Sequence, residues 1–371
     1  MTTILATLFL GLLLAYANGA NDNFKGVATL YGSGTTHYKK ALYWATATTF
    51  LGSLAALVLA KGLLASFSGK GLVPDSVVAL QNYSTSISLA AALTVLLATR
   101  WGLPVSTTHA LIGALLGAGW LASPADVNWE KLVSAFFLPL AATPLLATAG
   151  TMMIYPVLRW ARVRSAITKE TCLCVGTETV ASAPAGRGTD TLMLQTQTVV
   201  DFGTEATCVY SGAVFGANAQ TILDAFHYLS AGIVSFARGL NDTPKIAALF
   251  LAGSTLPTEL AIAGVALAIL AGGLLSARKV AETLSHHVTP MNSGQGFTAN
   301  IVTGIIVILA SKLNLPVSTT HISCGALFGI GAVTRQARWK TIASILMAWI
   351  TTLPLAAALG ALCFLITGSG E

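Results

Sequence analysis

Two identical strings of hydroxyl-rich residues, Leu103–His109 and Leu315–His321, both read Leu-Pro-Val-Ser-Thr-Thr-His. Proline suits the first turn of a helix, where the backbone N–H groups lack partners within the helix. Those N–H groups, the neighbouring hydroxyls and the positive end of the helix dipole all favour an oxyanion. Hydroxyls can instead bond back to carbonyls of their own helix, but the identical repetition favours a shared anion site. Its predicted contacts are Ser106, Thr107, Thr108, Ser318, Thr319 and Thr320.

Two further segments place a carboxylate one helical turn before a lysine. Asp22 precedes Lys25 and Asp242 precedes Lys245, and each Asp ends a Gly-x-Asn-Asp string. Two carboxylates repel an anion but supply the oxygen ligands that a hard cation prefers, whereas lysine and arginine counter the charge of an anion. A structural ion pair at a helix end is the alternative. The predicted cation-coupling residues are Asn18, Asn21, Asp22, Asn241, Asp242 and Asn300, and the predicted cationic contacts to the substrate are Lys25, Lys245 and Arg238.

His109 and His321 end the two repeated strings, and they are candidates for proton coupling or for contact with the substrate. Capping of the local fold is the alternative for both. Serine, threonine, histidine and aspartate together could also suggest a hydrolase, but neither a nucleophile elbow nor an HExxH motif frames them. We therefore predict no enzymatic activity, no resident metal and no cofactor.

The composition predicts where these polar residues lie. Hydrophobic residues make up 54% of the chain and charged residues only 9%, against about 25% charged residues in soluble domains. A surface with so few charges requires lipid around it. The apolar runs are about twenty residues long, as membrane helices are, and they lack the dyad alternation of barrel strands. We therefore expect an all-α polytopic membrane protein.

The apolar runs fall into two halves whose landmarks align at a nearly constant offset, so we predict an internal duplication. Residues 1–158 form the predicted first transmembrane repeat, 159–219 a polar linker and 220–371 the second repeat. The expected helical elements are 3–19, 40–61, 84–102, 105–121 and 132–158, then 220–239, 258–276, 297–313, 317–333 and 341–366. We expect the linker cysteines Cys172, Cys174 and Cys208 to be free thiols rather than metal ligands.

Basic residues predict the orientation of these elements in the membrane. They cluster at 39–40, 159–169, 278–279 and 335–340, and an odd number of crossings per half places all four clusters on one side. The second repeat is then inverted relative to the first, as in secondary transporters. The positive-inside rule makes the basic side, with the linker, cytoplasmic and leaves both termini outside the cytoplasm.

The elements that flank each repeated string either both cross the membrane or form a re-entrant helical hairpin with the string at its tip. We favour the hairpin because the proline of the string ends the preceding helix. We also expect the first helix of each half to be broken at its Gly-x-Asn-Asp string, as the discontinuous helices of transporters are.

With these residues in view, the chain resembles the inorganic phosphate transporter (PiT) family. The resemblance rests on both Gly-x-Asn-Asp strings and both Leu-Pro-Val-Ser-Thr-Thr-His strings, and it covers both halves. It implies uptake of inorganic phosphate coupled to a cation, which is sodium in some members and the proton in others. It places the two Asn-Asp pairs on the paired signatures of the family. Thr49 and Asn300 stand where many members carry glutamate, which leaves the coupling ion open.

We therefore expect a secondary active transporter that imports inorganic phosphate together with a sodium ion or a proton by alternating access. Its expected location is the cell membrane or an inner membrane. A carrier of sulfate or another tetrahedral oxyanion is the first alternative, and a passive anion channel is the second. The predicted partners are phosphate and the lipid bilayer, with no nucleic acid. A homo-oligomer is left open.

Overall fold

The computed structural model describes residues 2–59, 62, 64, 67–182, 193–204, 215–252 and 256–368. The chain divides into two compact units, one formed by residues 1–155 with 227–371 and the other by residues 156–226. Cys208 lies outside the described residues.

Ten long helices correspond to the ten predicted elements in the described part of the chain. Those of the first half are α1 (Thr2–Asp22), α3 (Tyr38–Leu59), α6 (Gln81–Arg100), α7 (Thr107–Ala122) and α9 (Leu138–Arg164). Those of the second half are α11 (Ala219–Ala252), α12 (Thr258–Ser276), α14 (Ser293–Lys312), α15 (Thr319–Thr334) and α16 (Trp339–Gly368). Short helical segments connect them: α2 (Ala28–Gly32), α5 (Asp75–Val78), η1 (Pro124–Asp126), α8 (Trp129–Lys131), η2 (Leu132–Phe137), α13 (Arg278–Glu282) and η3 (Thr283–His287).

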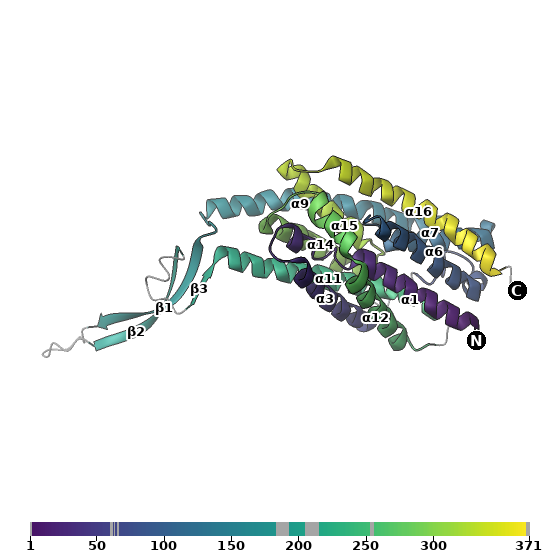
Figure 1. The fold of residues 1–371 in the computed structure, drawn as a ribbon, viewed down its shortest axis with the longest axis horizontal. Helices are drawn as coiled ribbons and strands as arrows, with labels where there is room; N and C mark the ends of the chain where they lie inside the picture. The colour runs from purple at the N-terminus through teal and green to yellow at the C-terminus, as the bar shows by residue number, and fades with distance from the viewer. Residues whose placement is uncertain are drawn as a thin grey trace. The chain divides into compact units, whose positions relative to one another are not determined.

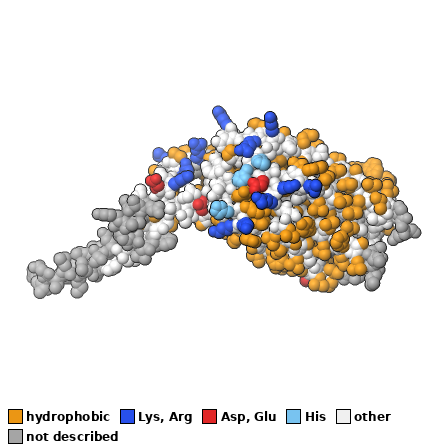
Figure 2. All heavy atoms as spheres, viewed as in Figure 1, with side chains coloured by type: hydrophobic (Ala, Val, Ile, Leu, Met, Phe, Trp, Pro, Cys, Tyr) orange, Lys and Arg blue, Asp and Glu red, His pale blue; other side chains and the backbone are white. Residues whose placement is uncertain are grey.

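Several of these helices have the length and composition of membrane spans. Six helical segments of the described chain meet that criterion: 38–59, 81–100, 129–164, 258–276, 293–312 and 339–368. Figure 2 shows hydrophobic side chains over much of the visible face, with lysine and arginine side chains gathered toward one end. In Figure 1, α1 begins and α16 ends at the same end of the helical unit. The protein is therefore a mostly helical polytopic membrane protein.

The two Gly-x-Asn-Asp strings end up in different local structures. Helix α1 ends at Asp22, and the backbone turns before α2 begins at Ala28. Helix α11, by contrast, continues through Asn241, Asp242 and Pro244 to Ala252. The expectation of a broken helix is therefore wrong for the second half. Pro244 removes one intrahelical hydrogen bond, but α11 remains helical on both sides of it.

The unit formed by residues 156–226 departs from the all-α expectation. It contains the strands β1 (Thr171–Ser182), β2 (Met193–Thr204) and β3 (Phe215–Asn218), which form an antiparallel sheet in the order β2-β1-β3. Threonine and valine, which favour strands, are frequent in β1 and β2. The expectation of free thiols holds for Cys172 but is wrong for Cys174, which is disulfide-bonded.

The two halves of the helical unit interlock through glycine contacts that repeat with the duplication. A Cβ atom on Gly19 of α1 would lie 2.0 Å from the carbonyl oxygen of Ile269 in α12. The equivalent Gly239 of α11 stands in the same relation to α3, because its Cβ would lie 2.2 Å from the carbonyl oxygen of Thr49. Small residues allow helix backbones to approach this closely. The first helix of each half therefore packs on the second helix of the other half.

Gly272 of α12 provides a stability test of this packing. A Cβ atom there would lie 1.9 Å from the carbonyl oxygen of Tyr16, so Gly272→Ala must push α1 and α12 apart. Overpacking of this kind costs about 1–3 kcal/mol, and we expect a lower unfolding temperature of the detergent-solubilised protein. Gly264→Ala on the same helix is the matched control, because its nearest neighbour, an atom of Leu12, would be 3.6 Å away. Equal unfolding temperatures for the two variants would contradict the close crossing.

Candidate functional site

Each repeated string forms the N-terminus of a helix, as the sequence predicts. Ser106 and Ser318 are the N-caps of α7 and α15, and their hydroxyls accept hydrogen bonds from the backbone N–H groups of His109 (3.1 Å) and His321 (3.2 Å). Serine is a favoured N-cap because its side chain satisfies one of the unpaired donors of the first turn. The two serines therefore shape the helix ends, and Thr107, Thr108 and Thr320, which follow them, contact the other polar residues.

Asn21 holds the extended segment that leads into α7. Its side-chain N–H groups donate to the hydroxyl of Thr99 (2.9 Å) and to the carbonyl oxygen of Leu103 (3.0 Å). Its side-chain oxygen accepts the backbone N–H of Val105 at 3.1 Å. A buried backbone segment outside regular structure needs such partners. The Asn-Asp string of α1 thus positions the first hydroxyl string.

The ammonium group of Lys25 lies among oxygen atoms from both halves of the chain. It forms an ion pair with Asp22 and donates to the side-chain oxygen of Asn21 at 3.0 Å. It also donates to the carbonyl oxygen of Val105 at 2.7 Å and to the hydroxyl of Thr320 at 2.5 Å. The Thr320 hydroxyl in turn donates to the Val105 carbonyl at 2.9 Å. We call the four oxygens that contact Lys25 the first oxygen cage.

Lys245 repeats this arrangement from the other half. Its ammonium group pairs with Asp242 (3.3 Å) and donates to the carbonyl oxygen of Val317 (2.7 Å) and the hydroxyl of Thr108 (2.9 Å). We call these three oxygens the second oxygen cage. Each lysine thus contacts the aspartate carboxylate and the valine carbonyl of its own half. It also contacts a threonine hydroxyl from the opposite half. The equivalent residues of the two halves thus make equivalent contacts.

Asn18 and Arg238, which occupy equivalent positions in the two halves, connect the cages. The side-chain N–H groups of Asn18 donate to the carboxylates of Asp22 (3.0 Å) and Asp242 (3.4 Å) and to the Thr107 hydroxyl (3.0 Å). The guanidinium of Arg238 donates to the side-chain oxygens of Asn18 (3.2 Å) and Asn23 (3.3 Å). Asn18 therefore connects the carboxylates of Asp22 and Asp242 to the guanidinium of Arg238.

The electrostatic balance of this cluster favours an anion. Asp22, Lys25, Arg238, Asp242 and Lys245 are each at most 4% exposed. Three cations against two carboxylates leave one positive charge in excess when all five groups are ionised. Charges removed from water interact strongly and must be balanced by partners. A bound anion would supply the missing negative charge.

Asn300 and the two histidines of the repeated strings were predicted to belong to the site, but their side chains contact other groups in the structure. Asn300 bonds to the hydroxyls of Thr29 (3.1 Å) and Ser230 (3.5 Å), and among the described residues its side chain has no hydrogen bond to either Asn-Asp pair. The rings of His109 and His321 pack edge to face with centroids 4.3 Å apart. Within the described chain, neither ring is hydrogen-bonded to the aspartates or lysines, so the histidines contact each other instead.

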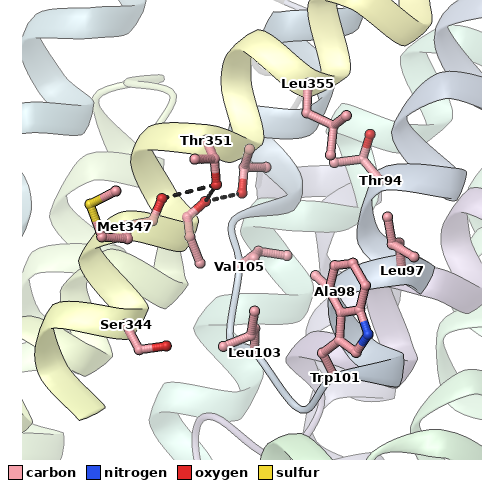
Figure 3. Close-up of a pocket in the computed structure, with 12 residues that line it drawn as sticks. Thr94, Leu97, Ala98, Trp101, Leu103, Val105, Ser344, Met347, Thr351 and Leu355 are labelled. Carbon is pink, nitrogen blue, oxygen red and sulfur yellow. Dashed lines mark hydrogen bonds between the residues drawn. The ribbon is translucent and has the colours of Figure 1, made fainter. Parts of the chain in front are cut away.

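A cavity of about 240 Å³ lies next to the site, between α6, the segment before α7 and α16. Figure 3 shows that Trp101 and Leu97 lie on one side of it and Met347 on the other. The side chain of Val105 lines this cavity, whereas its carbonyl oxygen binds Lys25. The lining is mostly apolar and includes none of the paired aspartates and lysines. The charged cluster itself is closed from solvent.

Several contacts of the candidate site were not predicted from the sequence. The carbonyl oxygens of Val105 and Val317 bind the two lysines, and the indole of Trp349 donates to the carbonyl oxygen of Pro104 at 3.0 Å. The identical position of the valines in the two strings was a signal for their shared role. Trp349 carries no such signal, because its partner in the repeated string lies 245 residues away in the chain.

A polytopic membrane protein with a buried charged cluster between two duplicated helix starts has the features of a membrane transporter. The chain matches the phosphate transporter family over residues 18–360, and it belongs to this family.

Its relatives and structural neighbours agree with this assignment. A protein named as a phosphate permease in Pyrococcus abyssi is 27% identical over 98% of this chain and 97% of its own length. A Rhizobium meliloti protein named as a low-affinity inorganic phosphate transporter is 27% identical over 95% of this chain and 93% of its own. The solved structure of a protein described as the sodium-dependent phosphate transporter shares the fold, with a TM-score of 0.78, 22% identity and full coverage of both chains.

Proposed function

We propose that this chain imports inorganic phosphate, coupled to a cation, by alternating access to the buried cluster. The observation that carries the proposal is the meeting of both repeated strings with three buried cations and two carboxylates. The excess positive charge and the names of the relatives support phosphate as the anion. Of the two coupling ions expected from the sequence, sodium and the proton, sodium is the one named for the structural neighbour.

The proposed phosphate contacts are the threonine hydroxyls and the N-termini of α7 and α15. Thr107 and Thr108 follow the first N-cap, and Thr319 and Thr320 follow the second. Free N–H groups of a first helical turn and the helix dipole both attract a phosphate group. Lys25, Lys245 and Arg238 supply its counter-charges. The aspartates hold these cations in place and are poor direct ligands of an anion.

We further propose that the two halves are inverted repeats with a re-entrant hairpin at each string. The part of α11 from residue 227 onward runs through the helical unit in the opposite direction to α1 in Figure 1, which supports the inversion. The four clusters of basic residues in the sequence support a cytoplasmic basic side. The protein then lies in the cell (inner) membrane with both termini outside the cytoplasm. The linker, residues 159–219, is proposed to be cytoplasmic.

Uptake of radiolabelled phosphate into proteoliposomes tests the proposed function. We expect saturable uptake driven by an imposed sodium or proton gradient, and weak competition by sulfate. Strong competition by sulfate would instead identify a carrier of tetrahedral oxyanions. Flux that neither saturates nor responds to a cation gradient would identify a passive anion channel. No phosphate uptake under any gradient would contradict the proposal.

A further inference from the structure

Both oxygen cages have the ligand chemistry of a monovalent cation site. The first consists of a carboxylate, an amide oxygen, a backbone carbonyl and a hydroxyl, and the second of a carboxylate, a carbonyl and a hydroxyl. Hard cations select oxygen ligands of these kinds. In secondary transporters, carbonyls of non-helical backbone commonly coordinate the driving ion. Val105 and Val317 lie in such backbone, immediately before α7 and α15.

Each cage is already occupied by a cation that belongs to the chain. An ammonium group has three N–H donors and no acceptor, and Lys245 finds three oxygens at 2.7–3.3 Å. Lys25 finds four. The donors of both lysines are therefore fully used by the cages.

We propose that the ammonium groups of Lys25 and Lys245 are tethered replacements for coupling cations, so that phosphate transport by this chain requires no sodium. The inference rests on the proposed function. Of the two expected coupling ions, it excludes sodium and leaves the proton. The lysines neutralise Asp22 and Asp242 and help attract the anion, as bound sodium ions would. Because a lysine cannot leave the chain, it cannot carry the energy of a sodium gradient.

The charge balance argues against sodium in addition to the lysines. Before phosphate binds, the cluster already has one positive charge in excess, and each sodium ion would add another in a region closed from water. A singly charged phosphate then balances the cluster without sodium. A sodium ion that entered a cage would also have to displace an ammonium group. That group would then remain buried without its carboxylate, which is strongly unfavourable. Within the cluster, sodium therefore competes with the lysines instead of assisting them.

The first test compares phosphate uptake by the full-length protein in proteoliposomes with sodium, potassium or N-methylglucamine outside, at one pH and one imposed pH gradient. We expect initial rates that agree within about twofold, whereas loss of a required bound ion would lower them by at least about tenfold. A tenfold fall without sodium would overturn the inference but leave phosphate transport intact. Absence of uptake in every medium would count against the proposed function alone.

Direct binding tests the inference even when uptake fails. We expect the purified wild-type protein to show no saturable binding of radiolabelled sodium, with or without phosphate. Saturable sodium binding that increases with phosphate would overturn the inference, because binding of the two ligands would then be coupled.

The third test removes the tethered cations. The double variant Lys25→Asn, Lys245→Asn keeps the other cage oxygens, so we expect it to bind sodium and to lose at least about tenfold of its uptake in sodium-free medium. Sodium or ammonium should restore part of that uptake. Lys312→Asn, which changes an exposed lysine at the end of α14, is the control. A folded double variant that binds no sodium and responds to neither ion would contradict the assignment of the cages as cation sites.

Discussion

Replacement of Asp22 by asparagine should abolish phosphate uptake. The carboxylate of Asp22 pairs with Lys25 and accepts hydrogen bonds from Asn18 (3.0 Å) and Thr107 (3.2 Å). Asparagine keeps the size but leaves the Lys25 ammonium buried without its counter-charge, and the loss of one partner of a buried pair costs about 3–5 kcal/mol. In an initial-rate assay we expect uptake to fall by at least about 100-fold.

The equivalent substitution in the second half should be milder. The Asp242 carboxylate lies 3.3 Å from the ammonium of Lys245 and 3.4 Å from the amide nitrogen of Asn18, so its loss breaks longer contacts. We expect Asp242→Asn to retain more uptake than Asp22→Asn. Asp75→Asn, at an exposed aspartate of α5, is the control. Size-exclusion profiles would separate loss of transport from loss of folding. Near-normal uptake by a folded Asp22→Asn variant would exclude the carboxylate from the mechanism.

Replacement of Arg238 by glutamine should be nearly as damaging. The Arg238 side chain is 1% exposed and joins Asn18 to Asn23. Its removal takes away the excess positive charge and leaves the oxygens of both asparagines without this donor, and each such buried orphan costs about 1–3 kcal/mol. We expect the Michaelis constant for phosphate to rise by at least about tenfold.

Lysine at this position separates charge from geometry. Arg238→Lys keeps the charge but loses the forked donor that spans Asn18 and Asn23, and the two side chains are not interchangeable at such sites. We expect intermediate uptake from this variant. Arg159→Gln, at an exposed arginine near the end of α9, should transport normally. Equal Michaelis constants for Arg238→Gln and the wild type would show that Arg238 does not help to attract the anion.

The elements themselves were predictable from local patterns. Apolar runs bounded by glycine, proline and charge predicted a helix over 258–276, which is the extent of α12, and one over 105–121, which α7 matches within two residues. Burial in lipid makes long apolar runs helical because every backbone group must find a partner inside the segment. The polar linker escapes this constraint. Its threonines and valines favour strands, but the pairing of β1 with β2 depends on contacts between segments that no local run of residues reveals.

The chemistry of the site was only partly predictable. The spacing of Asp22 and Lys25 indicated an ion pair one turn apart, and the structure contains it. The other contacts of Lys25, to Val105 and Thr320, join residues that are 80 and 295 positions away. Asn300 illustrates the opposite case. Its residue type suited a cation site, but the packing of α14 places it beside Thr29 instead.

By itself, the sequence determined the membrane environment, the duplication, the helical segments and the residue types that we propose meet a phosphate ion. These properties follow from local composition and from repetition along the chain. Only the tertiary structure decided that each half lends a threonine to the lysine of the other, and that both lysines fill oxygen cages. The physical reason is that these contacts depend on how closely the helices cross. That approach is set by backbone contacts at Gly19 and Gly239 between segments more than 180 residues apart.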